Sequence, residues 1–368
     1  MAAIVHSVEY HVNQGGMPSF GKNGMLRRTI FFSGVMLTMR FPRLLSVGLI
    51  LALVVVSVFA GSTEARTRWI AIATGTTGGV YYPYGGALAE LWNRHVPNVD
   101  ATAEATGASV ENLRLIQRGE SDVALVQGDV AYDAYHGRDR FQGAPIRTRV
   151  LMVLYPNVYH AVSLKSIHDR LGLNSFRDVA GHRFSVGAPG SGNEHATSLV
   201  FQALGMSFDD IVVQRFAYTE TARALRDNQL DAGSWVVGLG HASLQELDAT
   251  HPIHLIPISD EEQEVVVNTY PFYTPFTIPA GTYSSVQEDV ETIALWNVLV
   301  AGEDFPEDLA YELVKAAYEN KSMLDAAYAP GAPYNTLENL VNSPIPLHPG
   351  VIRYAEEQGV AIPDHLRP

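Results

Sequence analysis

Two glycine-rich segments hold residue types that could bind a small molecule. Thr74–Gly79 and Gly187–Glu194 each follow a short apolar run typical of a strand, and each precedes a sequence typical of a helix. At such a turn, free backbone N–H groups and the positive end of the helix dipole can hold a carboxylate or a phosphate. Glycine lets the backbone approach a ligand, and serine or threonine adds hydroxyl donors. One such segment is usually an ordinary tight turn, but two at matching positions predict a shared ligand cleft.

The same segments do not match the catalytic motifs that they partly resemble. Gly187–Gly192 has the spacing of a phosphate-binding Walker loop, but Asn193 and Glu194 stand where Lys and Ser or Thr are required. Ser191 lies in the sequence Pro-Gly-Ser-Gly, which is not the G-x-S-x-G turn of a serine hydrolase. A triad of Ser191, His195 and a distant aspartate therefore stays a minor alternative, and we expect no catalytic residues.

Residues at the ends of predicted strands are further candidates for the cleft. Gln127 and Trp235 each lie near the end of such a strand, which is where open α/β sheets bind ligands. Tyr81 follows the first glycine-rich segment, and a tyrosine can close over a ligand and donate a hydrogen bond. Core packing is an equal alternative for Tyr81 and Trp235, whereas the polar Gln127 favours the cleft.

The chain offers little for metal or redox chemistry. It has no cysteine, which excludes disulfides, a thiol nucleophile, Cys-ligated zinc and a lipid-modified N-terminal cysteine. His251 and His254 lie beside Pro252 in a strand-like stretch with no carboxylate nearby in sequence. A structural role is therefore favoured over metal ligation, and we expect neither a metal nor another cofactor.

The N-terminal region has the pattern of a secretory signal peptide. Arg40 and Arg43 precede the uncharged apolar stretch Leu44–Ala60, and small residues permit cleavage after Ala60 or Ala65. Such a run is at the short end of what spans a bilayer, about 17–25 residues, so cleavage is favoured over a permanent anchor. We expect a soluble periplasmic protein, or a membrane-tethered one if the signal stays uncleaved.

The charge balance restricts the possible partners. Residues 1–65 hold five of the 25 Lys and Arg and two of the 39 Asp and Glu, so 20 basic and 37 acidic residues remain, a formal net charge of −17. This balance argues against nucleic acid and anionic lipid surfaces. It does not exclude an anionic ligand, because a local site can be positive on a negative protein. About 300 residues exceed the usual single core, which predicts two domains.

From Trp69 onward, apolar β-branched runs alternate with helical stretches. The first half predicts strands at Trp69–Ala73, Asp100–Glu104 and Asp122–Gln127, and helices at Tyr81–His95 and from Ser109, a candidate N-cap, to about Gly119. The rhythm restarts after Tyr155–Pro156, with strands at Phe184–Gly187, Ile211–Val213 and Ala232–Val237 and helical stretches at Asn193–Leu204 and Ala222–Arg226. The last third adds a strand, Thr292–Val300, and helices at Pro306–Glu319 and Pro349–Gln358. We predict an α/β fold of two similar lobes, each a mostly parallel sheet flanked by helices.

Several motifs, in order along the chain, resemble those of the TAXI group of TRAP-transporter solute receptors. They are Ala73–Tyr82, Ser109–Arg114, Asp122–Asp129, Gly187–Glu194, Ile278–Tyr283 and Leu347–Gly350. The resemblance covers the chain from about Trp69 to its end. It implies a two-lobed periplasmic-binding-protein fold, type II-like, with a hinge and closure on the ligand. Residues 66–158 and 268–368 would form lobe 1 and residues 159–267 lobe 2, after upstream residues and a signal at 1–65, with a true start near Met39 plausible.

The resemblance also implies which residues contact the ligand. They are Thr74, Gly75, Thr77, Gly78, Tyr81, Asn112 and Gln127 from the first lobe and Pro189, Ser191, Gly192, Asn193 and Glu194 from the second. Asn193 stands where a threonine is common in the family, which leaves its contact open. No arginine clearly matches the carboxylate clamp of other TRAP receptors, so backbone amides and hydroxyls would hold the anion.

The implied function is capture of a small organic anion and its delivery to TRAP membrane permease subunits. The family's ligands are small carboxylates, which include dicarboxylates, amino acids and oxo acids. Two alternatives stay open: a binding protein that reports its ligand to a membrane kinase, and an enzyme on the same fold. Neighbouring genes would separate transport from sensing. The sequence does not define the ligand, the coupling ion or the oligomeric state.

Overall fold

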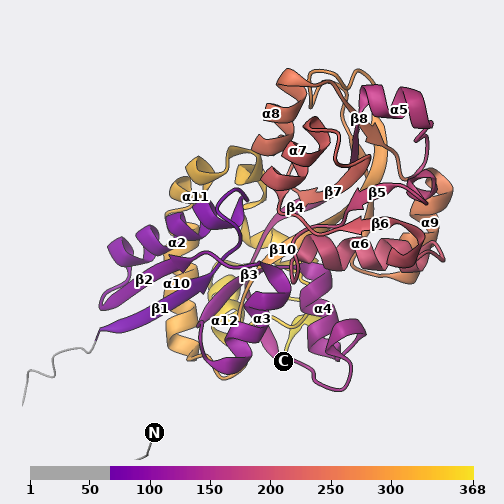
Figure 1. Cartoon of the computed structure of the whole chain (residues 1–368). Helices are drawn as coiled ribbons and strands as arrows, with labels where there is room; N and C mark the ends of the chain where they lie inside the picture. Colours follow the sequence, from indigo (N-terminus) through magenta and orange to yellow (C-terminus); the bar gives the residue numbers. More distant parts are fainter. Residues whose placement is uncertain (1–66) are drawn as a thin grey trace, which may run out of the picture. The chain divides into compact units, whose positions relative to one another are not determined.

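The computed structural model describes residues 67–368 (Figure 1). The predicted signal peptide, with its apolar stretch Leu44–Ala60, lies outside the described residues. Within residues 67–368, no helix combines the length and the apolar character needed to cross a bilayer. The α/β class predicted from the sequence is confirmed, because helices flank one ten-stranded mixed sheet.

The first part of the described chain alternates strands and helices as the sequence predicts. Its elements are β1 (Arg68–Ala73), α2 (Tyr81–His95), β2 (Val99–Glu104), α3 (Ser109–Arg118) and β3 (Val123–Gln127). β1 pairs in parallel with both β2 and β3. α2 forms because Leu88, Leu91 and Trp92 recur at helical spacing, and it buries this face.

A second group of parallel strands follows later in the chain. Its elements are β5 (Arg183–Ser185), α6 (Gly192–Ala203), β6 (Val212–Gln214), α7 (Tyr218–Arg226) and β7 (Ala232–Val237). β5 pairs in parallel with β6 and β7. β7 is buried along its whole length, as expected for a strand covered on both faces.

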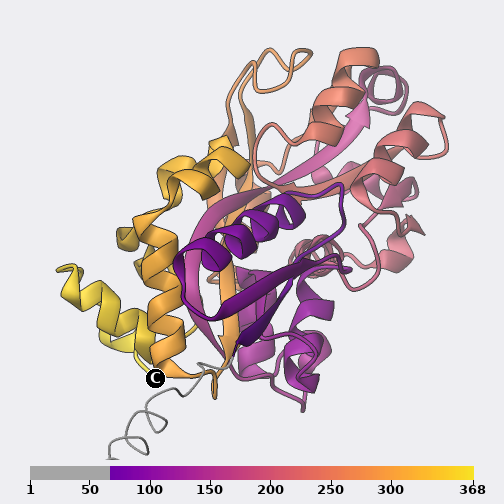
Figure 2. The same cartoon turned by 90° about the vertical axis from the view of Figure 1, so that its left-hand side faces the viewer.

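Two long antiparallel strands join these groups into one sheet. They are β4 (Thr148–Leu164) and β10 (Val290–Gly302), and the strand order is β2-β1-β3-β10-β4-β7-β5-β6. The short strands β8 (Ile253–Ile256) and β9 (Thr274–Ile278) pair with β4 and β10. The parallel pairs therefore lie in the outer parts of the sheet and the antiparallel strands lie between them (Figure 2).

Two separate hydrophobic cores lie along this sheet, and they define a first and a second lobe. β4 contributes to the first core before Pro156 and to the second core after Asn157. β10 contributes to the second core before Trp296 and to the first core after Asn297. Both long strands thus cross from one lobe to the other. The lobe boundaries given by the sequence stay a prediction.

Proline lies within β4 without ending it. The strand–helix rhythm restarts after Tyr155–Pro156, yet β4 runs through this point without a break. Pro156 is paired with Trp296, next to a register shift between Trp296 and Val298. A proline has no N–H to donate to a ladder and is tolerated at such an irregularity. One of the two register shifts in the β4–β10 pairing therefore lies at the crossing between the lobes.

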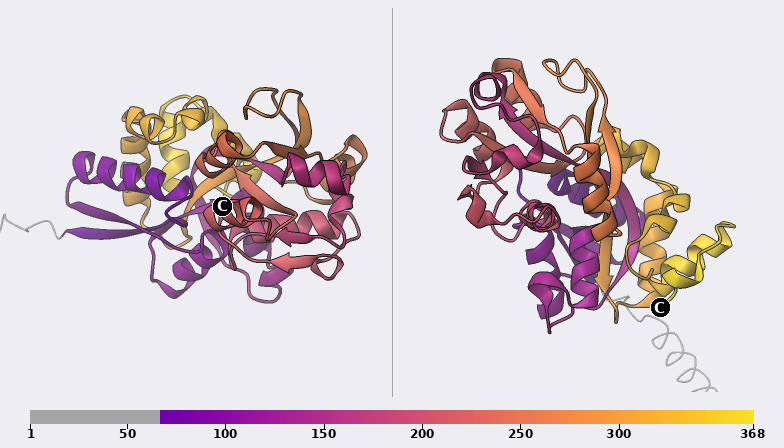
Figure 3. Two further views of the ribbon diagram at one scale, coloured as in Figure 1. Left: turned by 45° about the horizontal axis from the view of Figure 1, so that its top comes forward. Right: turned by 90° about the vertical axis from the view of Figure 1, so that its right-hand side faces the viewer.

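The remaining helices cover the two lobes. They are α4 (Gly128–His136), α5 (Lys165–Leu171), α8 (Ala242–Thr250), α9 (Asp260–Thr269), α10 (Glu307–Glu319), α11 (Ser322–Ala327) and α12 (Pro349–Glu357), with 3₁₀ turns at η1 (Asp139–Phe141), η2 (Phe176–Val179), η3 (Phe208–Asp210), η4 (Ala329–Tyr334), η5 (Leu337–Asn342) and η6 (Asp364–Leu366). α10 and α11 pack against α2 (Figure 3). The end of the chain therefore completes the first lobe.

Candidate functional site

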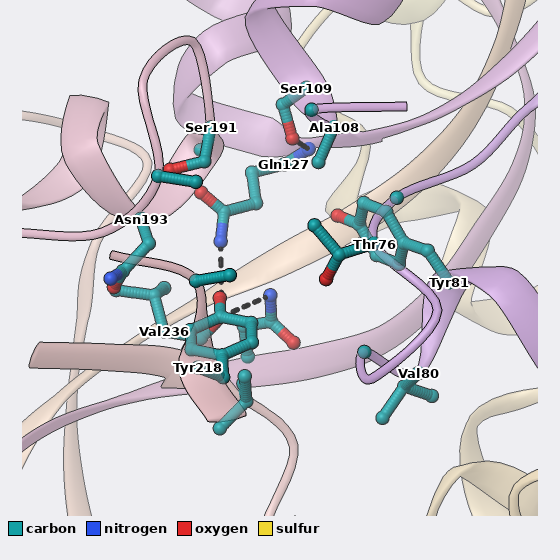
Figure 4. Close-up of a pocket in the computed structure, with 18 of the residues that line it drawn as sticks. Thr76, Val80, Tyr81, Ala108, Ser109, Gln127, Ser191, Asn193, Tyr218 and Val236 are labelled. Carbon is teal, nitrogen blue, oxygen red and sulfur yellow. Dashed lines mark hydrogen bonds between the residues drawn. The ribbon is translucent and has the colours of Figure 1, made fainter. Parts of the chain in front are cut away.

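A pocket lies between the two lobes, where β3 and β7 end (Figure 4). It encloses about 560 Å³, open solvent at its mouth included. Its lining consists of Gly75, Thr76, Gly79, Val80, Tyr81, Gly107, Ala108, Ser109 and Gln127 from the first lobe, Ala188, Ser191, Gly192, Asn193, Ala217, Tyr218, Val236 and Val237 from the second, and Tyr155 and Asn157 from β4. Both glycine-rich segments therefore contribute to one cavity.

Four helices begin at this pocket. Their N-caps and first residues line it: Val80 and Tyr81 of α2, Ala108 and Ser109 of α3, Ser191 and Gly192 of α6, and Ala217 and Tyr218 of α7. No side chain caps the first N–H groups of α2 or α3. Unpaired N–H donors and the positive ends of helix dipoles favour negative charge at such a place. Four helix N-termini thus converge on a pocket, and no basic side chain of residues 67–368 lines it.

The start of α3 differs from the prediction. Ser109 was expected to cap the helix, but Ala108 occupies the N-cap position with a φ of 79° and Ser109 is the first helical residue. From that position the hydroxyl does not cap the first turn, and its oxygen accepts a hydrogen bond from the Gln127 N–H at 3.0 Å. Ser109 thus ties the start of α3 to the end of β3 at the pocket wall.

The Val236 carbonyl is a meeting point of polar groups from both lobes. It accepts hydrogen bonds from Gln127 Nε2 at 3.2 Å, Asn157 Nδ2 at 2.9 Å and the Tyr218 hydroxyl at 3.2 Å. Gln127 ends β3 in the first lobe, whereas Val236 lies on β7 in the second. These contacts fix the orientation of both amides and close the floor of the pocket (Figure 4).

Three buried polar atoms at the pocket have no hydrogen-bond partner among the described residues. They are Gln127 Oε1, Asn193 Oδ1 and the Tyr155 hydroxyl. The Asn193 amide is also fixed, because its Nδ2 donates to the Ser234 carbonyl at 2.9 Å. Gln127 and Asn193 are 2% and 1% exposed, and an unpaired acceptor at that depth costs about 1–3 kcal/mol.

No side chain with a formal charge lines the pocket in the described residues. Tyr81 donates its hydroxyl proton to Asn297 Oδ1, and burial raises the pKa of Tyr81 and of Tyr155 well above its ordinary value. Both phenols therefore stay neutral. Charge behind the lining still acts on it, because the nearby Asp129 carboxylate also raises the pKa of Tyr81.

Six of the predicted site residues line the pocket, namely Gly75, Tyr81, Gln127, Ser191, Gly192 and Asn193. Their roles toward a ligand stay a prediction. Ser191 also caps α6, because its Oγ accepts from the Glu194 N–H at 3.1 Å.

The other predicted site residues lie outside the lining: Thr74, Thr77, Gly78, Asn112, Pro189, Glu194 and Trp235. Thr74 donates to the Glu104 carbonyl at 2.6 Å, and Asn112 donates to the carbonyls of Thr74 and Leu125. These bonds brace the strand ends behind the first glycine-rich segment. Trp235 is fully buried in the second core and donates to Ser243 Oγ, which matches the core alternative.

The geometry excludes the serine triad. His195 directs Nε2 at Asp133 Oδ2, 3.0 Å away, and Nδ1 at Asp139 Oδ2, 3.4 Å away. The Ser191 oxygen instead accepts the backbone bond that caps α6. The imidazole therefore pairs with Asp133, and no hydrogen bond joins its ring to the Ser191 hydroxyl among the described residues.

Several lining residues were missed by the sequence argument. Asn157 interrupts the mostly apolar stretch Val150–Tyr159 of β4 with an amide side chain, and this could have marked it. Tyr218 opens α7 and lies against the pocket because α7 begins there. The packing of α7 on the sheet places Tyr218 at the pocket, and no local sequence pattern predicts that position.

The fold and the pocket define an α/β protein with a cavity between two lobes that no charged side chain lines among the described residues. The chain belongs to the NMT1-like family, whose pattern matches residues 72–359. Among solved structures, it is similar to MatC from Rhodopseudomonas palustris with bound malate, at 15% identity over 73% of this chain and 90% of that one, with a TM-score of 0.47. It is also similar to PhnD1 from Prochlorococcus marinus in complex with methylphosphonate, at 12% identity over 71% and 90% of the two chains, with a TM-score of 0.47. The periplasmic aliphatic sulphonate binding protein SsuA from Escherichia coli matches at 12% identity over 79% and 90%, with a TM-score of 0.40.

Proposed function

We propose that this protein is an extracytoplasmic solute-binding receptor that captures a small organic anion between its lobes. The convergence of four helix N-termini on one pocket carries this proposal. Such N-termini bind carboxylates and phosphates through backbone N–H groups. The site needs no arginine clamp, in agreement with the sequence, where no arginine matched one.

The ligand carries hydrogen-bond donors in addition to its anionic group. Gln127 Oε1 and Asn193 Oδ1 are acceptors whose amide nitrogens are already used. An amino or hydroxyl group on the ligand would satisfy them, whereas an oxo group offers acceptors alone. Of the three ligand classes expected from the sequence, this favours an amino acid over an oxo acid or a plain dicarboxylate.

Transport is the role that fits such a receptor best. The motifs of the TAXI group and the secretory signal pattern both support a periplasmic protein that delivers its ligand to TRAP permease subunits. A ligand that contacts both glycine-rich segments favours the closed lobes through that double contact. The protein needs no catalytic group for this role, and the only triad suggested by the sequence is not assembled.

Calorimetry with three related ligands tests this proposal. L-glutamate, 2-oxoglutarate and glutarate share two carboxylates and differ at one carbon, which bears an amino, an oxo or no group. We expect glutamate to bind at least tenfold more tightly than the other two, because each satisfied buried acceptor contributes about 1 kcal/mol or more. Equal binding of all three would overturn the donor requirement, and a screen of small carboxylates without any binding would overturn the anion receptor.

A further inference from the structure

Charged residues from both lobes meet directly behind the second glycine-rich segment. Glu194, in the first turn of α6, receives Arg140 Nη1 at 3.2 Å on one oxygen and Arg215 Nε at 2.7 Å on the other. Arg140 lies in η1 of the first lobe, beside the core residue Phe141. Arg215 lies in the second lobe, as Glu194 does, between β6 and α7. One carboxylate thus pairs with an arginine from each lobe.

The next residue makes a second connection between the lobes. His195 is completely buried and belongs to α6, whereas its partners Asp133 and Asp139 belong to α4 and η1 of the first lobe. His195 Nε2 lies within hydrogen-bond distance of Asp133 Oδ2, at 3.0 Å, and Nδ1 lies 3.4 Å from Asp139 Oδ2.

These contacts also shape the ligand pocket. Glu194 Oε2 accepts the Gly190 N–H at 3.0 Å, which holds the segment that supplies Ser191, Gly192 and Asn193 to the lining. Burial alone would raise the pKa of the Glu194 carboxyl, but the hydrogen bonds from Arg215 and Gly190 and the Arg140 charge hold it below its ordinary value. The carboxylate is therefore ionised and depends on these partners.

We propose that Asp133, Asp139 and Arg140 of the first lobe and Glu194 and His195 of the second form a cross-lobe latch. The latch stabilises the closed state without touching the ligand, and Arg140 acts as a positioning residue through Glu194. If the lobes separate, the latch contacts break, whereas the Arg215–Glu194 pair stays within the second lobe. The contribution of the latch to affinity rests on the proposed binding function, but its effect on closure does not.

A distance measurement tests the latch in the ligand-free protein. The chain has no cysteine, so spin labels at Gln117→Cys on α3 and Asp209→Cys on η3, both exposed, report the lobe separation. Arg140→Gln removes the cross-lobe ion pair, and Arg215→Gln is the matched control because it removes the pair to the same carboxylate within one lobe. We expect Arg140→Gln to shift the distance distribution toward longer values and Arg215→Gln to leave it as in the wild type.

Two outcomes decide the proposal. If Arg140→Gln leaves the distances unchanged, or if both variants change them equally, the latch is wrong. Where glutamate binds the wild type, Arg140→Gln should also weaken its affinity about fivefold, which corresponds to the loss of one partly buried ion pair. If no carboxylate binds the wild type, the proposed function fails, yet the distances still test the latch. Thermal unfolding of both variants checks that each remains folded.

Discussion

At the residue scale, Asp129 is a carboxyl group whose buried environment opposes its charged form. It lies in the first turn of α4, completely buried, two residues after Gln127. Burial raises the pKa of its carboxyl to about 6, although the His195 charge and hydrogen bonds from Tyr273 and the Val130 N–H act in the opposite direction. The folded protein therefore holds a proton on Asp129 more tightly than the unfolded chain does.

This raised pKa predicts a pH dependence of stability. The carboxyl has a pKa of about 6 in the folded state and an ordinary value of 3.8, which we take for the unfolded chain. Its protonated form therefore stabilises the folded protein fully below pH 3.8, and this stabilisation is lost as the pH rises through 6. The loss amounts to about 3 kcal/mol. Asp129→Asn removes this titration, so the variant should gain stability relative to the wild type between pH 4 and pH 7. Urea unfolding of both proteins at the two pH values measures this gain, and a difference that does not change with pH would contradict it.

At the scale of elements, the start of α6 determines how closely the lobes can approach. Gly192 is the first residue of this helix, and a Cβ there would lie 2.1 Å from Gln127 Oε1 and 2.8 Å from Ser109 Oγ. Both of those atoms belong to the first lobe. The helix itself does not require glycine, since its backbone at this residue is not in the left-handed region. The glycine is therefore needed for the closed arrangement of the lobes.

Gly192→Ala should accordingly weaken ligand binding while the protein remains folded. The added methyl group clashes across the pocket, so we expect ligand affinity to fall at least tenfold and the labelled lobes to stand further apart. Gly86→Ala in α2 is the control, because no atom lies within 4 Å of its added Cβ and alanine stabilises a helix by about 1 kcal/mol relative to glycine. Wild-type affinity in Gly192→Ala would show that the neighbouring side chains move aside and that glycine is not needed at this position.

Local patterns predicted the elements of the two parallel groups, but they missed the long strand β4 and the helices α4, α5, α8 and α9. α2 and β7 have the bounds expected from the sequence, because helical spacing and a short, mostly apolar run are local signals. The pairing of β4 with β10 joins Val158 to Ala294, and no local signal carries such a distant contact. The same limit applies to the pocket. The glycine-rich turns could be predicted, but Asn157 and Tyr218 line the pocket only because of the packing of the whole chain.

At the scale of the whole molecule, the two lobes share the strands that run through both cores. β4 and β10 pair with each other on both sides of the crossing, and each supplies buried residues to both cores. Loss of one core would leave half of each long strand without its packing. The two cores are therefore coupled through the backbone of these strands as well as through contacts between the lobes.

This coupling predicts that the cores unfold together. Trp92 is completely buried in the first core and Trp235 in the second. The chain has four tryptophans, so one variant that keeps only Trp92 and one that keeps only Trp235, with phenylalanine at the other three positions, each report on one core. We expect the fluorescence transitions of both variants in urea to coincide with their own transitions in circular dichroism, as two-state unfolding requires. Separate fluorescence and circular dichroism midpoints within either variant would show that one lobe can unfold while the other stays intact. The long strands would then act as a flexible connection between independent units, and closure would depend on the pocket and the latch alone.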